Sequence, residues 1–514
     1  MKLKAKLLDI QAGGRNIAIL DDGTANLLGV HSSDRVEVTN KNRQVIAIVN
    51  IASNFPKGSL GIYEEISKKL QIEAGESVEV RLAELPESLR YVQAKIRNER
   101  LRENEINLIV RDVVERHLSD IELASFVTAL HIHGLSMDEI EALSKAMVKT
   151  GSTLALDKKP ILDKHSIGGI PGDKTSILIV PIVAAAGFII PKTSSRAVTS
   201  PAGTADRVET LCPVNLSVDE IKEVVEKTNG CMVWGGALDL APADDIFIQI
   251  EYPLAIDPML LPSILSKKKA IGATHVVIDI PTGRGAKIKT IGEADDLAYD
   301  FIDLGKRLGM NIQCGITFGE QPLGYTIGPA LESREALSTI MGNGPDDLRE
   351  KATSIAGILF EMVGVKNGKQ KAEELLKSGK AERKLRQIIQ AQGGDPEVKP
   401  EDIKVGDKKA EVTADKDGVV LWIENEDIAK LAREAGAPKD KGAGLVLRVK
   451  LGDHVKKGQV LFEIFAERSP KLGSAVGLAD KLQPIGLSKR PEDRMLMNRV
   501  PTHVVHRKTF ILER

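Results

Sequence analysis

A chain of 514 residues, with 42% hydrophobic and 28% charged residues, has the balance of a soluble protein and is too long for a single hydrophobic core. Its formal net charge of −1 excludes a general electrostatic attraction to nucleic acid or to an anionic membrane, and its 3% aromatic content disfavours a stacking surface for single strands. We therefore expect a multidomain α/β protein in which any anion site is built locally, with no nucleic-acid or membrane partner.

The cysteines and the apolar segments point to a cytoplasmic location. Cys212, Cys231 and Cys314 are too few and too scattered for a disulfide framework or a zinc site, so reduced thiols are the simple interpretation. The N-terminus has no apolar signal core. The apolar run of residues 177–190 is shorter than a membrane span and contains Pro181.

Residues 1–86 are predicted to form a small N-terminal β-rich domain. Apolar and polar residues alternate in residues 36–38, residues 45–49 are mostly β-branched, and Gly13-Gly14 is a turn signal. This pattern is typical of a compact barrel. Pro86 marks the end of the domain.

A helical domain is predicted for residues 87–151. Ser119 with Glu122, and Ser136 with Glu139, have the spacing of capping boxes. Capping boxes satisfy free backbone N–H groups where helices begin. We therefore expect two successive helices to begin at these serines.

From residue 152 to about residue 400, short apolar runs alternate with helical stretches. Residues 231–234, 275–280 and 311–317 are typical of strands, which favours an α/β sheet with ligand loops at the strand ends. The run of residues 177–190 suits a buried helix, although its β-branched part, residues 177–183, also suits a strand. Residues 366–407 are charged and helical, which indicates a connector.

Two polar segments flank that apolar run. The first, residues 160–176, combines three glycines with the polar residues Lys164, His165, Ser166, Thr175 and Ser176. Glycines let backbone N–H groups approach an anion without obstruction by Cβ. The second segment, residues 193–204, is rich in Ser and Thr, contains one arginine, and would return to the same side. The pattern predicts one anionic ligand, such as phosphate, held from two directions.

A nucleotide-hydrolysing P-loop is the main alternative for the first segment. Its pattern is glycine, four residues, then Gly-Lys-Ser/Thr, but here Asp173 separates Gly172 from Lys174. A carboxylate at that position would repel phosphates. An ordinary glycine-rich turn with capping Ser and Thr residues explains either polar segment, but not both together with Lys164 and Arg196.

Residues 406–514 are predicted to form a C-terminal α+β domain. Residues 418–422, 444–449 and 460–464 are β-rich, and the turn of residues 452–458 resembles biotinyl and lipoyl hammerhead modules. The modified-lysine hairpin of those carriers is missing. We therefore expect a hammerhead-like domain with a structural or assembly role.

Several motifs carry a family resemblance. Residues 163–169, Asp-Lys-His-Ser-Ile-Gly-Gly, with the Gly-Asp-Lys-Thr-Ser that follows, resemble the signature of the thymidine and pyrimidine-nucleoside phosphorylases. Residues 192–200 and 233–238 resemble more closely the archaeal AMP phosphorylases, the longer subtype that carries an N-terminal extension. The resemblance runs through nearly the whole chain.

The resemblance implies a domain arrangement. Residues at about 246–272 would pack on the helical domain, and residues 152–245 and 273–405 would form a central mixed α/β sheet domain that binds phosphate. The active site would be the cleft between these two domains. A homo-oligomer is implied, at least a dimer, with the C-terminal domain as the candidate contact for a larger assembly.

The resemblance also implies a reaction. AMP and phosphate would give adenine and ribose 1,5-bisphosphate, with CMP and UMP as further candidate substrates. Phosphate itself is the nucleophile and co-substrate, so no metal or cofactor is required. A thymidine or pyrimidine-nucleoside phosphorylase of the longer subtype shares the architecture and is the first alternative. A P-loop-like NTP-binding protein is the remote one, which Mg²⁺-dependent ATP binding would favour.

By matching position, the resemblance assigns residues to the two anionic groups. The phosphate ligands would be Lys164, Ser166, Thr175, Ser176 and Ser194, with His165 beside them as a catalytic or loop-orienting residue. The nucleotide-binding residues would be Gly169, Ser195, Arg196, Ala197, Val198, Thr199, Ser200, Thr204, Ser263 and Lys287. Thr204 would also lie near the phosphate, and Arg196 and Lys287 are the candidate ligands of the 5′-phosphate.

Asp257 is the implied proton donor. No arginine occurs between Arg207 and Arg284, the region in which thymidine phosphorylases place an arginine for a pyrimidine carbonyl. Instead, residues 254–258, Leu-Ala-Ile-Asp-Pro, resemble the AMP phosphorylase segment whose aspartate protonates the base. A protonated Asp257 could donate to N7 of adenine if burial or a neighbouring anion keeps the proton on it. The alternative is an aspartate that caps a helix beginning near Pro258.

Overall fold

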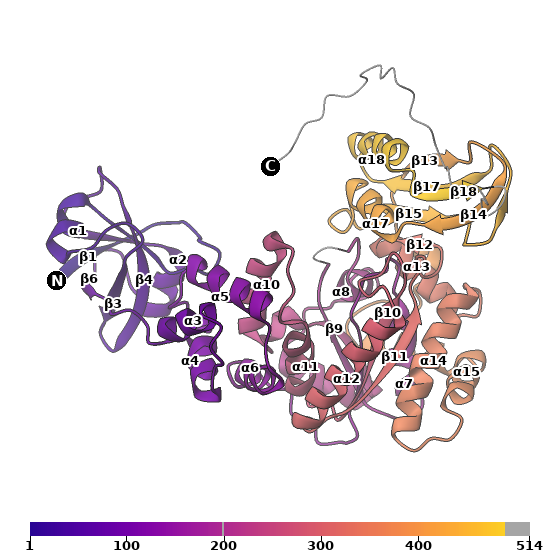
Figure 1. Ribbon diagram of the computed structural model, residues 1–514, viewed down its shortest axis with the longest axis horizontal. Coiled ribbons are helices and arrows are strands. Elements are labelled where there is room, and N and C mark those ends of the chain that lie inside the picture. Colours follow the sequence, from indigo (N-terminus) through magenta and orange to yellow (C-terminus); the bar gives the residue numbers. More distant parts are fainter. Residues whose placement is uncertain (198–199, 489–514) are drawn as a thin grey trace.

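The computed structural model describes residues 1–197 and 200–488 of the chain (Figure 1). A β-barrel lies at one end of the molecule, a helical bundle lies beside it, and a central α/β domain follows. The C-terminal α+β domain packs on the central domain. None of the helices in the described ranges is long and apolar enough to cross a membrane.

The N-terminal domain is a closed barrel with the strand order β1-β5-β2-β4-β3-β6, as the sequence predicts. Its strands are β1 (Lys2–Leu7), β2 (Ile17–Leu20), β3 (Arg35–Asn40), β4 (Arg43–Ile51), β5 (Ser59–Ile62) and β6 (Ser77–Leu82), and its helices are α1 (Asp22–Leu28) and α2 (Glu64–Leu70). Alternate side chains point inward, so Val78 and Val80 of β6 are fully buried while Glu79 between them is exposed.

The helical bundle contains four consecutive helices and one that returns from later in the chain. These are α3 (Ser88–Ile96), α4 (Glu103–Val114), α5 (Asp120–His133), α6 (Met137–Lys149) and α10 (Pro242–Leu254). Both predicted capping boxes are present, at Ser119 and at Ser136. Phe247 of α10 meets Phe126 of α5 with ring centroids 6.2 Å apart, which joins the returning helix to the bundle core.

The next helix, α11 (Leu260–Ala270), connects the bundle to the central domain. It packs against α6. Its buried residues Ile264 and Leu265 belong to the same apolar cluster as Val276 and Ile278 of the central sheet. The segment at about 246–272 therefore contributes one helix to the bundle and one to the boundary with the sheet.

The central domain is built on parallel strands. They are β7 (Leu162–Ser166), β8 (Ile190–Ser194), β9 (Gly230–Trp234), β10 (His275–Thr282) and β11 (Asn311–Phe318). The order is β11-β10-β7 and β8-β9, and a parallel bridge between Ile161 and Ile189 joins the two groups. Because all these pairs are parallel, the carboxyl ends of the strands lie at one edge of the sheet.

Helices cover the central sheet on both faces, as Figure 1 shows. They are α7 (Thr175–Ala185), α8 (Thr204–Val208), α9 (Val218–Thr228), α12 (Ile291–Arg307), α13 (Pro329–Ile340), α14 (Asp346–Met362), α15 (Gly368–Lys377) and α16 (Lys380–Ala391), with short 3₁₀ helices η1 (Gly235–Leu238) and η2 (Pro400–Asp402).

Two sequence interpretations in this domain are wrong. Residues 177–183 belong to the helix α7 and not to a strand, and all of them are buried because α14 and α16 enclose the helix. An apolar run that is buried on every side has no periodicity with which to separate the two structures. Residues 366–407 are also more than a connector, since Leu385 and Ile388 of α16 lie in the same core as α7.

The C-terminal domain has the predicted α+β composition. It contains β13 (Lys408–Thr413), β14 (Gly418–Ile423), α17 (Asn425–Glu434), β15 (Gly444–Leu447), β16 (His454–Val455), β17 (Val460–Ala466), α18 (Ser469–Leu482) and β18 (Ile485–Ser488). A short strand from the central part of the chain, β12 (Thr326–Ile327), completes the sheet β12-β15-β17-β13, and β16-β14-β18 form a second sheet. The two domains are therefore joined through a shared sheet.

Candidate active site

The carboxyl edge of the central sheet gathers predicted phosphate ligands. Ser166 ends β7 and Ser194 ends β8. Ser166 lies opposite Asp279 of β10, and Ser194 lies opposite Trp234 of β9. Ligand loops of parallel sheets occupy this edge, so the two polar segments return to one side as expected.

Lys164 and Thr175 are in direct contact beneath this edge. Lys164 Nζ donates to Thr175 Oγ1 at 2.8 Å and lies 3.4 Å from Asp173 Oδ2, and the Thr175 hydroxyl donates to Asp173 Oδ1 at 2.5 Å. Thr175 and Ser176 are the first residues of α7. The N–H groups and the dipole at a helix N-terminus favour an anion, which suits a phosphate held above this point.

A buried set of ion pairs supports these residues. Lys268 Nζ lies 2.6 Å from Asp163 Oδ2, Lys192 Nζ lies 3.7 Å from Asp163 Oδ1, and Lys351 Nζ lies 2.9 Å from Asp279 Oδ2. Sequence reasoning did not assign these residues to the site. Lys268 stands in a run of three lysines, which is typical of a solvated helix end, and only the fold shows that it is buried.

These charges act on each other through a poorly hydrated interior. Burial lowers the pKa of Lys192 to about 7, with Asp163 opposing this effect and Lys268 and Lys164 adding to it. Burial opposes the ionisation of Asp173, but Lys164 and Lys351 hold the pKa of its carboxyl well below the usual range. The site therefore keeps Asp173 negative and makes the charge of Lys192 sensitive to a nearby anion.

His165 is partly buried next to the same lysines. Burial, followed by the charges of Lys268, Lys192 and Lys164, holds the pKa of His165 well below its usual range. The ring is neutral at physiological pH and can form hydrogen bonds, but it adds no positive charge for phosphate.

The second polar segment is held by acidic side chains. The backbone N–H groups of Ala197 and Gly203 donate to Asp206 Oδ2 at 2.7 and 3.0 Å. The Ser200 hydroxyl donates to the carbonyl of Ala202 at 3.2 Å. Ser195 is exposed and Thr204 begins α8. Val198 and Thr199, two of the predicted nucleotide-binding residues, lie outside the described residues.

Arg196 is bound to protein groups. Its guanidinium donates to both carboxylate oxygens of Glu209, at 2.8 and 2.6 Å, and lies over the ring of Trp234 at 5.0 Å. The hydrogen bond from Arg196, with the contact of Lys441 of the C-terminal domain 2.8 Å away, lowers the pKa of Glu209 to about 2 against the effect of burial. The role of Arg196 in nucleotide binding stays a prediction, and any ligand would meet a guanidinium that is already paired.

Gly169, Asp257 and Lys287 come from separate segments and meet. Lys287 Nζ donates to Asp257 Oδ2 at 3.1 Å, and both side chains are about half exposed. Gly169 has a φ of 94°, and a Cβ at this position would lie 2.6 Å from the backbone nitrogen of Lys287. Ser263 lies in the first turn of α11, just beyond the Asp257 loop.

Two alternative interpretations are wrong. Asp257 is not a helix cap, because α11 begins after Met259 and no side chain caps it. Lys174, the lysine that a P-loop would direct at phosphates, is fully buried, with its Nζ 3.0 Å from the carbonyls of Leu323 and Thr326 and 2.6 Å from Glu335 Oε2. It fastens the start of α7 to neighbouring segments instead.

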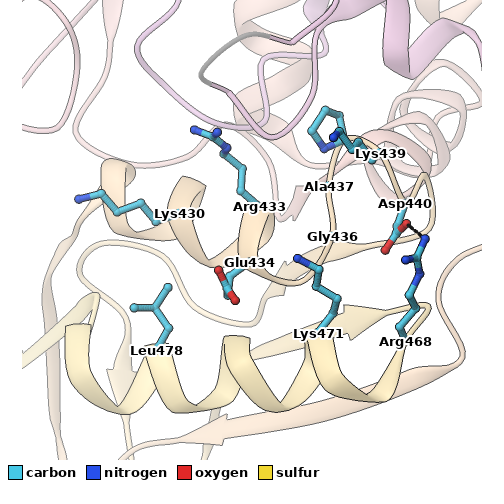
Figure 2. Close-up of a pocket in the computed structure, with 11 residues that line it drawn as sticks. Lys430, Arg433, Glu434, Gly436, Ala437, Lys439, Asp440, Arg468, Lys471 and Leu478 are labelled. Carbon is cyan, nitrogen blue, oxygen red and sulfur yellow. Dashed lines mark hydrogen bonds and ion pairs between the residues drawn. The ribbon is translucent and has the colours of Figure 1, made fainter. Parts of the chain in front are cut away.

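A basic cavity of about 540 Å³ lies apart from these residues, between α17 and α18 in the C-terminal domain (Figure 2). Lys430, Arg433, Lys439, Arg468 and Lys471 line it, and Arg468 pairs with Asp440 at 3.0 Å. It contains none of the predicted site residues.

A group of carboxylates and a histidine with the spacing of metal ligands lies at the end of α4. It consists of Asp112, Glu115 and His117, and His117 is within 3.2 Å of Asp112 and 3.4 Å of Glu115.

Comparisons with known proteins cover nearly the whole chain. Residues 89–151 match the helical bundle domain of a glycosyl transferase family, residues 158–382 match the a/b domain of that family, and residues 419–486 match the pyrimidine nucleoside phosphorylase C-terminal domain. The AMP phosphorylase of Thermofilum pendens is 50% identical over 500 residues, which cover 97% of this chain and 98% of the relative. The AMP phosphorylase of Thermococcus kodakarensis is 53% identical over 491 residues, which cover 94% of this chain and 97% of the relative.

Among solved structures, anthranilate phosphoribosyltransferase from Thermus thermophilus superposes with a TM-score of 0.51 at 20% sequence identity. The match covers 59% of this chain and 98% of that one. At this level of identity the likeness shows a shared fold alone.

Proposed function

This chain belongs to the AMP phosphorylases, and from that premise we propose how its residues convert AMP and phosphate into adenine and ribose 1,5-bisphosphate. The chain is a pentosyltransferase with AMP phosphorolysis as its activity. The observation that carries the assignment of residues is the contact of Lys287 with Asp257 beside Gly169. It joins a cation and an acid to the loop that follows the phosphate-binding strand.

Inorganic phosphate would bind at the start of α7. Lys164 supplies positive charge, and Ser166, Thr175, Ser176 and Ser194 supply hydroxyl groups. A phosphate oxygen then attacks C1′ of the ribose while the bond from C1′ to N9 of adenine breaks. The negative charge of the phosphate stabilises the oxocarbenium-like sugar in the transition state. Since phosphate supplies this charge, the reaction needs no metal or cofactor.

Asp257 would give the departing adenine its proton at N7, and Lys287 would bind the 5′-phosphate. A substrate phosphate that takes Lys287 leaves the Asp257 carboxyl without its cation, and loss of an opposite charge favours the protonated form. Binding of AMP would thereby prepare the acid for the reaction. A nucleoside without the 5′-phosphate would leave the ion pair intact.

The remaining predicted residues would line the nucleotide. Gly169 lets the backbone come close, Ser195, Ser200 and Thr204 would face the ribose, and Ser263 would face the base. Neutral His165 would contact the sugar or orient its loop. CMP and UMP are proposed as further substrates, because recognition through the 5′-phosphate is common to all nucleoside monophosphates.

The proposal also covers the cellular location and the oligomeric state of the enzyme. We place it in the cytoplasm, where its substrates are, in keeping with three free cysteines. We also propose a homo-oligomer, at least a dimer, in which the hammerhead-like C-terminal domain serves assembly. Gel filtration with light scattering measures the oligomeric state of the full chain. The same measurement on Arg468→Glu, which reverses a charge on the C-terminal domain, tests whether this domain serves assembly.

The reaction is tested by base release from AMP, adenosine, CMP, UMP and thymidine, each with and without phosphate. We expect adenine from AMP only when phosphate is present, and no loss of activity with EDTA. A preference for thymidine would show a nucleoside phosphorylase instead, and the roles of Asp257 and Lys287 would be withdrawn. Base release without phosphate would show a hydrolase.

A further inference from the structure

The loop of residues 283–287, which ends at Lys287, has a closely fixed backbone. The N–H of Gly283 donates to the carbonyl of Ile288 at 3.0 Å, and the N–H of Ala286 donates to the carbonyl of Gly283 at 3.0 Å. The side chain of Ala286 is buried in the core of the central domain. The placement of this loop therefore decides where the Lys287 side chain begins.

Asn425 of the C-terminal domain is buried against this loop. It is the first residue of α17 and is only 1% exposed. Its Nδ2 donates to the carbonyl of Gly319 at 2.8 Å. A Cβ at Gly285 would lie 2.9 Å from the same Nδ2 atom, so the amide fills the space that a side chain at Gly285 would need. Asn425 therefore contacts both the residue after β11 and the middle of the loop.

Gly319 connects Asn425 to the start of the loop as well. The N–H of Gly319 donates to the carbonyl of Thr282 at 2.9 Å. Thr282 is the last residue of β10 and leads directly into Gly283. The Asn425 amide therefore supports the loop at two points, at its start through Gly319 and at its middle through Gly285.

Two further residues of the C-terminal domain contact the same loop. Arg284 lies over the ring of Trp422 at 5.6 Å, and its guanidinium is 3.9 Å from the carboxylate of Glu424. The Arg284 side chain is largely exposed, and such contacts contribute little to stability. Residues 422–425 thus follow the loop, and Asn425 is their buried contact with it.

The amide oxygen of Asn425 shows that stability alone does not explain this residue. Oδ1 is buried and has no hydrogen-bond partner among the described residues. An unpaired acceptor in the interior costs free energy. The donor at Nδ2 and the fit beside Gly285 are what the amide supplies.

We propose that Asn425 is a positioning residue of the nucleotide site, whose amide holds the loop of residues 283–287 so that Lys287 reaches the 5′-phosphate of AMP. This role rests on the 5′-phosphate contact proposed for Lys287. Asn425 acts through Lys287 and not by touching the substrate. The C-terminal domain then takes part in substrate selection, besides the assembly role proposed above.

The test is the ratio of kcat/KM for AMP to kcat/KM for adenosine. Asn425→Ala removes the donor to Gly319 and the group beside Gly285, so the loop no longer holds Lys287 in place. The ratio should fall about tenfold, because adenosine has no 5′-phosphate to lose contact with. KM for inorganic phosphate should stay within about twofold, since its proposed ligands lie on β7, β8 and α7. An unchanged ratio would overturn the proposal.

A double-mutant cycle separates positioning from a general loss of structure. In a Lys287→Ala background, Asn425→Ala should change the ratio by no more than about twofold, because both substitutions remove the same contact. Losses that multiply would show that Asn425 does not act through Lys287. If Lys287→Ala alone leaves the ratio unchanged, the 5′-phosphate contact and the role of Asn425 fall together, whereas absence of adenine release from the unmodified enzyme would remove the proposed function itself.

Gln321→Ala is the matched control. Gln321 Oε1 accepts the backbone N–H of Leu451 at 2.9 Å, so this amide joins the same two domains at another point. Its loss should leave the ratio within about twofold of the unmodified enzyme. A fall equal to that in Asn425→Ala would mean that any loosening between the domains has this effect, and it would overturn a specific role for Asn425.

Gly285→Ala tests the same contact from the loop and serves if Asn425→Ala does not fold. The added Cβ would lie 2.9 Å from Asn425 Nδ2 and 3.1 Å from Asn425 Cβ, so the loop must move. We expect the ratio to fall in this variant too, again with little change in KM for inorganic phosphate. A ratio equal to that of the unmodified enzyme would contradict the proposal.

Discussion

Lys287 and Asp257 form an ion pair of 3.1 Å between the loop after β10 and the loop after α10. Both side chains are about half exposed, and pairs of this kind contribute little to stability. The contact matters because of its place. It joins the sheet that would hold phosphate to the loop that carries Asp257, the proposed proton donor.

Asp257→Asn should slow turnover strongly and leave the binding of AMP intact. An amide has the shape of the carboxyl but gives no proton, so kcat for AMP should fall about 100-fold to 10,000-fold. The dissociation constant for AMP, measured by calorimetry, should change by no more than about threefold. Unchanged turnover would remove Asp257 from the mechanism.

Lys287→Ala should separate nucleotides from nucleosides. Loss of a charged contact to the 5′-phosphate should lower kcat/KM for AMP by about 10-fold to 100-fold more than for adenosine. Lys439→Ala, a lysine of the C-terminal cavity, is the control and should leave both values unchanged. Equal losses for the two substrates would mean that Lys287 acts only through Asp257.

Lys164→Met and Lys174→Met should affect different properties of the enzyme, phosphate binding in the first variant and stability in the second. Lys164 faces the start of α7, so its loss should raise KM for phosphate at least about tenfold. Lys174 is fully buried against Glu335, so its loss should lower the free energy of unfolding by about 3 kcal/mol and leave KM for phosphate within about twofold. A large rise in KM for phosphate in Lys174→Met would restore the P-loop interpretation.

Phosphate binding should take up a proton from about pH 7 to about pH 8.5. Lys192 has a pKa of about 7, so above that value it is mostly neutral in the free enzyme. The charge of phosphate favours its ammonium form, so binding adds a proton, and this effect fades at lower pH because Lys192 is already charged. Calorimetry in two buffers with different ionisation enthalpies measures the uptake. Lys192→Met should abolish it, and uptake that persists in this variant would place the proton elsewhere.

The sequence predicted those helices and strands that a local pattern marks, such as a capping box or an alternation of apolar and polar residues. The capping boxes at Ser119 and Ser136 begin the two helices expected of them, and alternation around Val36 marks a barrel strand. The start of α7 could not be assigned in the same way, because Ile177 and its neighbours are apolar on every side of the helix. In such a segment the tertiary environment decides between helix and strand.

The candidate site likewise contains residues that the motifs indicated and contacts that no motif indicated. Motifs led to Gly169, Asp257 and Lys287, but no spacing indicates that Lys287 pairs with an acid 30 residues earlier. The burial of Lys268 could not be predicted, because a run of three lysines near a helix end is ordinary in a sequence. It becomes unusual only when the fold removes one of them from water.

Lys441 of the C-terminal domain lies 2.8 Å from Glu209 and 3.2 Å from Asp206, the two acids that hold Arg196 and the backbone of Ala197 and Gly203. The contact to Asp206 spans 235 residues of sequence. The anchoring of Ala197 and Gly203 by Asp206 therefore includes a cation from another domain, so it is complete only when the C-terminal domain has folded against the central domain.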